Sequence, residues 1–340
     1  MSRFGNFFRK KVAIDLGTAN TVVYVAGEGI VLNEPTVVAY SALSKEILAV
    51  GDDAREMLGR TPGSIIAARP LREGVIAEYT VTLALVSYFL KKATNGMSWK
   101  TDLMISVPGG STQVEKRAVL DACRAAGATD IYLMEEPLAA AIGANIPIAH
   151  ASGHMIVNMG GGTAEIAVIS LGQLVVYKSV RVAGTKFDEA ITSHMRKKYD
   201  LFIGERTAEN VKIEIGNVDL SRASNEKFYN VKGRDTISGL PKTIAVSEYS
   251  IGEALQAPAK LILEGIKEVL ALTPPELASD VVDKGIVLSG GTALLGGFEN
   301  YLSQALGVTV FVTEEPLLCV IRGVGRSIEN LENFKEAIRG

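Results

Sequence analysis

The chain has 340 residues, 47% of them hydrophobic, and is long enough for two domains that each bury a core. Its 35 Lys and Arg residues against 38 Asp and Glu residues leave a formal charge of −3 spread along the chain, which argues against a nucleic-acid partner and indicates a soluble globular protein. Cys123 and Cys319 lie far apart in apolar segments, as expected for reduced core thiols of a cytoplasmic protein.

The first eleven residues combine aromatic and basic side chains. Phe4, Phe7 and Phe8 have the i, i+3, i+4 spacing of one helix face. Two interpretations stay open: a short amphipathic helix at a membrane interface, or a frayed tail whose aromatic rings pack on the domain. The sequence contains no spanning helix, which needs roughly 18 apolar residues, and no secretory signal is predicted.

Predicted strands and helices alternate over the first 150 residues, which is the rhythm of an α/β fold. The helix after the strand at 103–108 is expected to begin with a capping box formed by Thr112 and Glu115. In chain order we expect strands over 12–16 and 21–25, a third over 29–33, an apolar segment ending at 40, helices near 52–58 and over 80–93, a strand over 103–108, a helix over 112–126, a strand over 131–134 and a helix over 138–144.

The order of elements begins again after residue 152. Residues 154–169 repeat the strand, turn and strand of 11–25, with Asn158 where the first copy has Asp15, and a third strand over 174–182 follows. Two half-molecules of one topology are therefore predicted, and the interface between such halves is a natural cleft for a ligand.

The remainder of the second half contains both helices and strands. A long helix over 250–272 is expected to end before Pro274 and Pro275. The other expected elements are a helix over 204–214, strands within 228–246 around a turn at 239–241, and a buried strand, glycine loop and helix from 284 onward.

The turns at 17–20 and 160–163 are rich in Gly and Thr. Such turns expose backbone N–H groups that polyphosphate oxygens can approach. Asp15, at the strand end before the first turn, could hold a hydrated Mg²⁺. A third glycine loop at 290–291 follows a buried strand. Neither a P-loop nor a dinucleotide fingerprint occurs, so these loops predict a phosphate site of another kind.

Three loops in this order, I-D-L-G-T-A-N-T, V-N-M-G-G-G-T-A-E and I-V-L-S-G-G-T-A-L-L, resemble the actin, hexokinase and chaperone ATPase superfamily. Within it the chain resembles the MreB family of bacterial actins nearly from end to end. Stretches that carry this resemblance include N-E-P-T-V-V-A-Y (33–40), A-R-P-L-R-E-G-V-I-A (68–77), E-E-P-L-A-A-A-I-G (135–143), A-E-I-A-V-I-S-L-G (164–172), G-E-R-T-A-E-N-V-K-I-E-I-G (204–216) and L-T-P-P-E-L-A-S-D (272–280).

The resemblance implies an actin-like fold of two RNase H-like domains that hold Mg-ATP in a cleft between them. Its domain I would span 12–150 plus a C-terminal helix at about 318–340, with a small subdomain at about 33–75, and domain II would span 151–317 with a small subdomain at about 184–248. Residues 1–11 would form the membrane-binding segment. Such a protein is an ATPase that polymerises under the cytoplasmic membrane and organises wall-synthesis proteins to set rod shape.

The family's site residues transfer motif by motif. Glu136 would orient the attacking water with Thr163 beside it, although a helix N-terminal acid is the other reading of Glu136. Asp15 and, weakly, Asn158 would hold Mg²⁺ through water. The residues implied to bind the nucleotide are Asp15, Gly17, Thr18, Ala19, Asn20, Asn158, Gly160, Gly161, Gly162, Thr163, Ala164, Glu209, Asn210, Lys212, Ile213, Gly290, Gly291, Thr292 and Ala293.

Asn158 departs from the family pattern, which usually has an acid at this position. The amide can still accept a hydrogen bond from a metal-bound water, but it supplies no negative charge for Mg²⁺. Nucleotide binding is therefore a firmer expectation than hydrolysis at the family's rate.

Membrane contact has two candidate segments. Met97 and Trp99 lie where members of the family carry a small apolar loop, and a Trp beside Lys100 suits an interface, although Trp99 could instead belong to the core. Phe4, Phe7 and Phe8 are the other candidate.

Two alternatives come from the same superfamily. A small-molecule kinase would need a catalytic acid aimed at a sugar hydroxyl, and no such motif occurs outside the MreB-like stretches. A chaperone ATPase would be expected to carry a substrate-binding domain, which this sequence does not contain.

Overall fold

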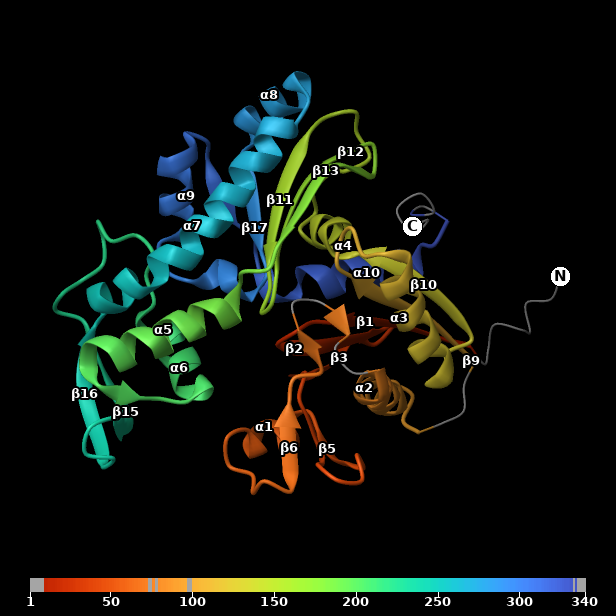
Figure 1. Cartoon of the computed structure of the whole chain (residues 1–340). Helices are drawn as coiled ribbons and strands as arrows, with labels where there is room; N and C mark the ends of the chain where they lie inside the picture. The colour runs from red at the N-terminus through yellow and green to blue at the C-terminus, as the bar shows by residue number, and fades with distance from the viewer. Residues whose placement is uncertain (1–8, 73–74, 77–78, 97–99, 333, 335–340) are drawn as a thin grey trace. The chain divides into compact units, whose positions relative to one another are not determined.

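A computed structural model describes residues 9–72, 75–76, 79–96, 100–332 and 334 (Figure 1). The chain divides into two units. The first comprises residues 1–152, 169–177 and 317–340, and the second comprises residues 153–168 and 178–316.

The first unit is built on a five-stranded sheet with the order β10-β9-β1-β2-β3. Strand β1 runs antiparallel to β2 and parallel to β9, which is in turn parallel to β10. Val12, Ala13 and Ile14 of β1 are fully buried, as expected for a central strand covered on both faces. The strands are β1 (Arg9–Leu16), β2 (Asn20–Val25), β3 (Gly29–Pro35), β9 (Lys100–Val107) and β10 (Asp130–Glu135).

Four helices complete this part of the unit. The α2 face that carries Leu85 and Phe89 packs into the core of the sheet. The capping box predicted for α3 is present, with Thr112 and Glu115 each bonded to the other's backbone N–H. The helices are α2 (Tyr79–Ala93), α3 (Gln113–Ala125), α4 (Glu136–Gly143) and α10 (Cys319–Glu329), and α4 and α10 lie side by side (Figure 1).

A small three-stranded sheet with the order β5-β4-β6 also belongs to the first unit. Its own apolar cluster contains Val37, Ala39 and Ala54. Its elements, with a neighbouring two-stranded hairpin, are β4 (Val38–Ser41), β5 (Ile47–Val50), α1 (Asp52–Met57), β6 (Ile65–Ala68), β7 (Leu71–Arg72) and β8 (Val75–Ile76).

The sheet of the second unit has the order β13-β12-β11-β17-β18, which matches β3-β2-β1-β9-β10 strand for strand. β11 runs parallel to β17, and β17 runs parallel to β18. The tip of the β12–β13 hairpin is grouped with the first unit. These strands are β11 (His154–Met159), β12 (Ala164–Ser170), β13 (Gln173–Val180), β17 (Ile286–Ser289) and β18 (Val310–Val312).

Helices and a further sheet of order β14-β15-β16 complete the second unit, in which α5 and α6 pack on each other (Figure 1). These elements are α5 (Gly184–Tyr199), β14 (Leu201–Phe202), α6 (Glu205–Ile215), β15 (Phe228–Asp235), β16 (Pro241–Ser247), α7 (Glu248–Leu272), α8 (Pro275–Lys284), the 3₁₀ helix η1 (Gly291–Leu294) and α9 (Phe298–Leu306). A second 3₁₀ turn, η2 (Pro316–Leu318), precedes α10.

The structure differs from the sequence prediction in several boundaries and elements, among them helix α8, which was not predicted. β1 begins at Arg9, so the last three residues of the predicted N-terminal segment are strand. Helix α4 begins at Glu136, two residues early, because Pro137 fits the first turn, where no intrahelical N–H is needed. Helix α5 was not predicted. Within the described residues, no helix has the length and apolar character required to cross a bilayer.

Candidate functional site

The carboxyl ends of the parallel strands β1, β9 and β10 meet at one edge of the first sheet. Ile14 pairs with Ile105, and Val107 pairs with Glu135, so Asp15, Ser106 and the start of α4 lie along that edge. Ligands bind at this edge in open parallel sheets because strands end there and loops begin.

Asp15 is partly buried and accepts a hydrogen bond from Ser106 Oγ at 2.7 Å. Burial raises the pKa of the Asp15 carboxyl to about 6, and the bond from Ser106 opposes this shift. A carboxylate has room for further donors beyond Ser106, so Asp15 can also accept from water bound to a metal.

The turn after Asp15 depends on glycine. A Cβ on Gly17 would lie 2.7 Å from the Asn20 carbonyl oxygen, closer than real side chains approach. At the tip, the Ala19 carbonyl accepts from the Thr36 backbone N–H at 2.9 Å and from Arg69 Nη1 at 3.2 Å. The turn is thus held through its carbonyl oxygen.

Glu136 is the first residue of α4 and is half-buried. Its neighbour Glu135 forms an ion pair with Lys116, Nζ to Oε1 at 3.4 Å. An acid at the start of a helix stabilises the helix macrodipole, and Glu136 also lies at the sheet edge that carries Asp15. Its location therefore fits both interpretations, a helix N-terminal acid and a residue that orients the attacking water.

In the second unit, Asn158 occupies the place that Asp15 has in the first. The residue is 4% exposed, and its Oδ1 accepts from Ser289 Oγ at 3.1 Å. Asn158 and Ser289 are register partners on β11 and β17. The same pair of positions therefore holds Asp15 with Ser106 in one unit and Asn158 with Ser289 in the other.

The second glycine turn is closed by a hydrogen bond from the Gly160 N–H to the Thr163 carbonyl at 2.9 Å. The Gly160 carbonyl accepts from Thr292 Oγ1 at 2.7 Å and from the Gly184 N–H at 3.2 Å. Thr163, Gly162 and Ala164 are buried. This hairpin is therefore a rigid loop that leads into β12.

Lys212 of α6 extends toward the same loop. Its Nζ donates to the Gly184 carbonyl at 3.1 Å and lies 2.8 Å from Asp188 Oδ1. Burial raises the pKa of Asp188 to about 6, against the opposing charge of Lys212. Lys212 Nζ, Thr292 Oγ1 and the Gly160 carbonyl all lie within 3.5 Å of the place that a Cβ on Gly184 would take, so a compact polar cluster forms at the hairpin.

The third glycine loop begins at Gly290, whose φ of +82° and close approach to the Met159 carbonyl exclude a side chain. Thr292 and Ala293 are buried in η1, and Thr292 joins this loop to the second hairpin. Two of the three predicted loops are thus in direct contact within one unit.

Other predicted site residues have different surroundings. Glu209 is half-buried one turn before Lys212, whereas Asn210 and Ile213 of α6 are exposed, Ile213 to 69%. Phe4, Phe7, Phe8, Met97 and Trp99 lie outside the described residues.

Direct metal coordination has no ready ligand set. In the described part of the chain, no three His, Cys, Asp or Glu side chains gather closely enough to hold a metal ion. Asp15, which accepts from Ser106, fits a hydrated Mg²⁺ held through water, whereas the neutral Asn158 brings no charge to a metal.

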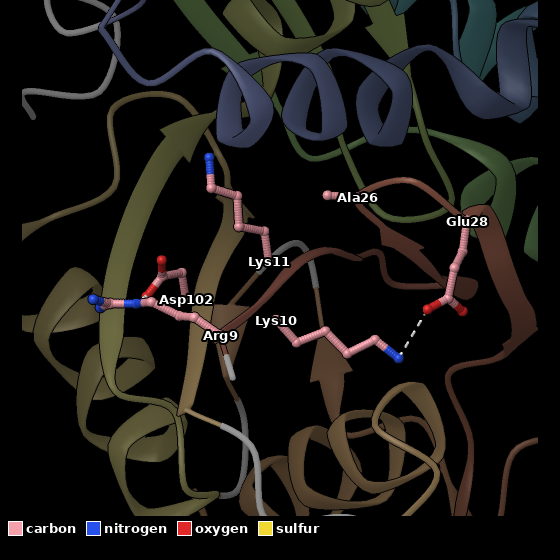
Figure 2. A pocket seen from close by; sticks show the side chains of 6 residues that line it. All are labelled: Arg9, Lys10, Lys11, Ala26, Glu28 and Asp102. Atoms are coloured by element: carbon pink, nitrogen blue, oxygen red, sulfur yellow. Dashed lines mark hydrogen bonds and ion pairs between the residues drawn. The ribbon is translucent and has the colours of Figure 1, made fainter. Parts of the chain in front are cut away.

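A cavity of about 250 Å³ opens in the first unit beside the start of β1 (Figure 2). Two of its cations are paired with acids: Arg9 Nε donates to Asp102 at 2.6 Å, and Lys10 Nζ lies 3.1 Å from Glu28. The third, Lys11, donates through Nζ to the Glu329 backbone carbonyl at 3.4 Å. Of the described residues that line it, none is predicted to bind nucleotide. The lining consists of Arg9, Lys10, Lys11, Ala26, Glu28 and Asp102.

Sequence reasoning missed several polar neighbours of the predicted residues. Ser106 and Ser289 each stand near the carboxyl end of a buried strand, a position that could have marked them as partners of Asp15 and Asn158. Asp188 lies in the unpredicted helix α5 and Arg69 follows β6, so their contacts depend on tertiary structure.

Comparison with known proteins yields consistent matches. The family model described as MreB/Mbl protein matches residues 9–336. The cell shape-determining protein Mbl of Bacillus subtilis is 45% identical over 328 residues, which cover 96% of this chain and 98% of Mbl.

Solved structures agree with this match. MreB5 of Spiroplasma citri bound to ADP has a TM-score of 0.91 at 35% identity, covering 98% of this chain and 99% of MreB5, and its complex with AMPPNP has a TM-score of 0.89. The MamK double helical filament, at 23% identity and a TM-score of 0.80 over 94% of this chain and 99% of MamK, shares the actin-like fold.

Proposed function

The chain belongs to the MreB/Mbl family, and from this premise we propose that it binds ATP, polymerises into filaments and organises cell-wall synthesis to maintain rod shape. The observation that carries the nucleotide part is the polar cluster of the second hairpin, where Gly160, Lys212 and Thr292 converge. MreB5, bound to ADP and to AMPPNP at 35% identity, supports the same proposal.

Within this proposal, backbone N–H groups of both glycine turns bind phosphate oxygens, and Lys212 with Glu209 faces the ribose. The 290–293 loop packs on the adenosine. Magnesium, when bound, neutralises phosphate charge and is held through water by Asp15. Each assignment rests on the family motif together with the local contacts described above.

Hydrolysis at this site is proposed to be slower than with an acid at position 158, because the neutral Asn158 supplies no charge for Mg²⁺. We assign Glu136 to orient the attacking water and Thr163 to lie beside it. The position of Glu136 at the start of α4, on the edge that carries Asp15, supports this assignment.

Self-association and membrane contact complete the proposal. The actin-like fold of the chain is shared with MamK, solved as a double helical filament. The aromatic segment at Phe4, Phe7 and Phe8 and the loop with Met97 and Trp99 are the proposed membrane contacts, at the inner face of the cell membrane.

Electron microscopy of the purified protein with ATP on a lipid monolayer, beside a phosphate-release assay, tests filament formation and hydrolysis together. Filaments with ATP are expected. Phosphate transfer to a sugar without filaments would instead indicate a small-molecule kinase of the same superfamily.

Co-sedimentation with liposomes tests the membrane contacts. A variant that lacks residues 1–8, which leaves strand β1 complete, and carries Trp99→Ser is expected to remain in the supernatant. Unchanged binding of this variant would contradict both proposed segments.

A further inference from the structure

Arg69 contacts the first glycine turn from the small sheet. Its Nη1 donates to the Ala19 carbonyl, and the Thr36 backbone N–H donates to the same oxygen. We propose that Arg69 is a positioning residue of this turn: it fixes the direction of the Ala19 carbonyl and thereby of the Asn20 N–H that phosphate would meet. The proposal deepens the proposed nucleotide-binding function and rests on it.

Peptide geometry supplies the link between Arg69 and phosphate. In a trans peptide the C=O and the following N–H point in opposite directions, and no cis peptide occurs among the described residues. An Ala19 oxygen held by two donors therefore keeps the Asn20 N–H on the opposite side. A turn that is already oriented loses less entropy when it binds phosphate.

The second hairpin also has carbonyl oxygens that protein donors hold, at the positions that match Gly17 and Thr18 rather than Ala19. Thr292 Oγ1 and the Gly184 N–H hold the Gly160 carbonyl, and the Thr185 N–H holds the Gly161 carbonyl at 2.8 Å. In each turn protein donors therefore hold at least one carbonyl oxygen. In the first turn Arg69 is one of the two donors that orient the Ala19 carbonyl.

Both groups that donate to the Ala19 carbonyl lie next to strands of the small sheet. Thr36 lies between β3 and β4, and Arg69 follows β6 directly. Thr36 is also tied to Thr21 of β2 by a buried hydrogen bond between their hydroxyls at 2.8 Å. The placement of the small sheet and the shape of the turn are therefore coupled through these two residues.

The test uses the full chain with Arg69→Ala, Arg69→Lys and Arg69→Gln. Arg60→Ala is the matched control, because Arg60 is an exposed arginine just before β6. Affinities for ATP, ADP and adenosine are measured by competition against a fluorescent ATP analogue. Amide hydrogen exchange of residues 16–21 is followed without nucleotide.

Arg69→Ala is expected to weaken ATP and ADP about tenfold, the effect of losing one hydrogen bond from a charged group, and to leave adenosine binding unchanged. Exchange at the turn should become faster. Arg69→Lys should retain more ATP affinity than Arg69→Ala, and Arg60→Ala should match the parent chain.

Two results would overturn the inference and leave the proposed function intact. The first is parent-like ATP affinity in Arg69→Ala, and the second is a loss of adenosine affinity as large as the loss of ATP affinity. If the parent chain itself does not bind ATP, the proposed function fails, and the inference, which rests on it, fails too. If Arg69→Ala does not fold, parent-like ATP affinity in both Arg69→Lys and Arg69→Gln overturns the inference, and a phosphate-specific loss in either supports it.

Discussion

Asp15 and Asn158 occupy matching positions in the two units and each accepts a hydrogen bond from a serine on the next parallel strand. The acid and the amide have nearly the same size, so both satisfy that serine. They differ in charge, and charge is what attracts a hydrated Mg²⁺. At these two positions the units therefore differ in charge, not in the contact with the serine.

Replacing Asn158 by Asp is expected to raise the rate of phosphate release about tenfold, within the range seen for residues that orient a metal's ligands. The new carboxylate keeps the bond from Ser289 and adds charge at the second hairpin. Release is measured with Mg-ATP on the assembled protein. An unchanged or lower rate would contradict this role, and Ser289→Ala serves as a control for damage to the pair.

Asp15 predicts a pH dependence of stability. Because burial raises its pKa from 3.8 to about 6, the fold favours the neutral acid. The contribution of Asp15 to the free energy of unfolding is complete below about pH 4 and is lost as the pH rises through about 6. The loss is roughly 3 kcal/mol at most.

Urea denaturation without nucleotide or Mg²⁺, from pH 4.5 to 7.5, measures this effect. The free energy of unfolding should fall with pH in the parent chain relative to Asp15→Asn, which cannot titrate. A difference between the two that stays constant across this range would contradict the shifted pKa of Asp15.

At the level of elements, the contact between α4 and α10 depends on two glycines. A Cβ on Gly143 would collide with the backbone of Cys319, and one on Gly323 would collide with the backbone of Ala139. The helices thus approach at backbone distance, and α10 joins the first unit through this contact.

Gly143→Ala is expected to destabilise the chain by about 3 kcal/mol, at the upper end of overpacking effects, because backbone cannot move aside as a side chain can. Thermal or urea unfolding provides the measurement. Gly63→Ala is the control, since a Cβ there meets nothing within 4 Å. Equal stability of the two variants would show that the α4–α10 contact can widen without cost.

Helix prediction succeeded at α2, which has a broad apolar face, and at α3, which has a capping box, and it missed α5 and α8. Helix α5 buries a narrow stripe at Phe187, Ile191 and Met195, and its remaining surface is largely polar. A stripe one residue wide at i, i+4, i+8 is a weak sequence signal for a helix of period 3.6. Only the packing of this segment against α6 and α7 identifies it as a helix.

For the whole molecule, the repeated sheet order confirms the predicted pair of halves with one topology.

A ligand that binds the folded chain and not the unfolded chain should stabilise the fold by mass action. ATP at 100 times its Kd is expected to add about 2.7 kcal/mol to the free energy of unfolding.

A thermal-unfolding series with increasing ATP and Mg²⁺ measures this stabilisation, with the same series in a simple sugar as the comparison. The midpoint should rise with ATP and stay constant with sugar. A midpoint that does not respond to ATP at millimolar concentration would argue against the proposed nucleotide site.

The sequence by itself determined the two related hairpins, because these depend on glycines, strand-end residues and local periodicity. Its resemblance to the MreB family implied the actin-like fold and marked the departure at Asn158. Only the tertiary structure decided the partners of those residues: Ser106 for Asp15, Ser289 for Asn158, Asp188 for Lys212 and Arg69 for Ala19. Each of these contacts joins elements far apart in the chain, and their proximity is set by sheet order and helix packing, which no local pattern encodes.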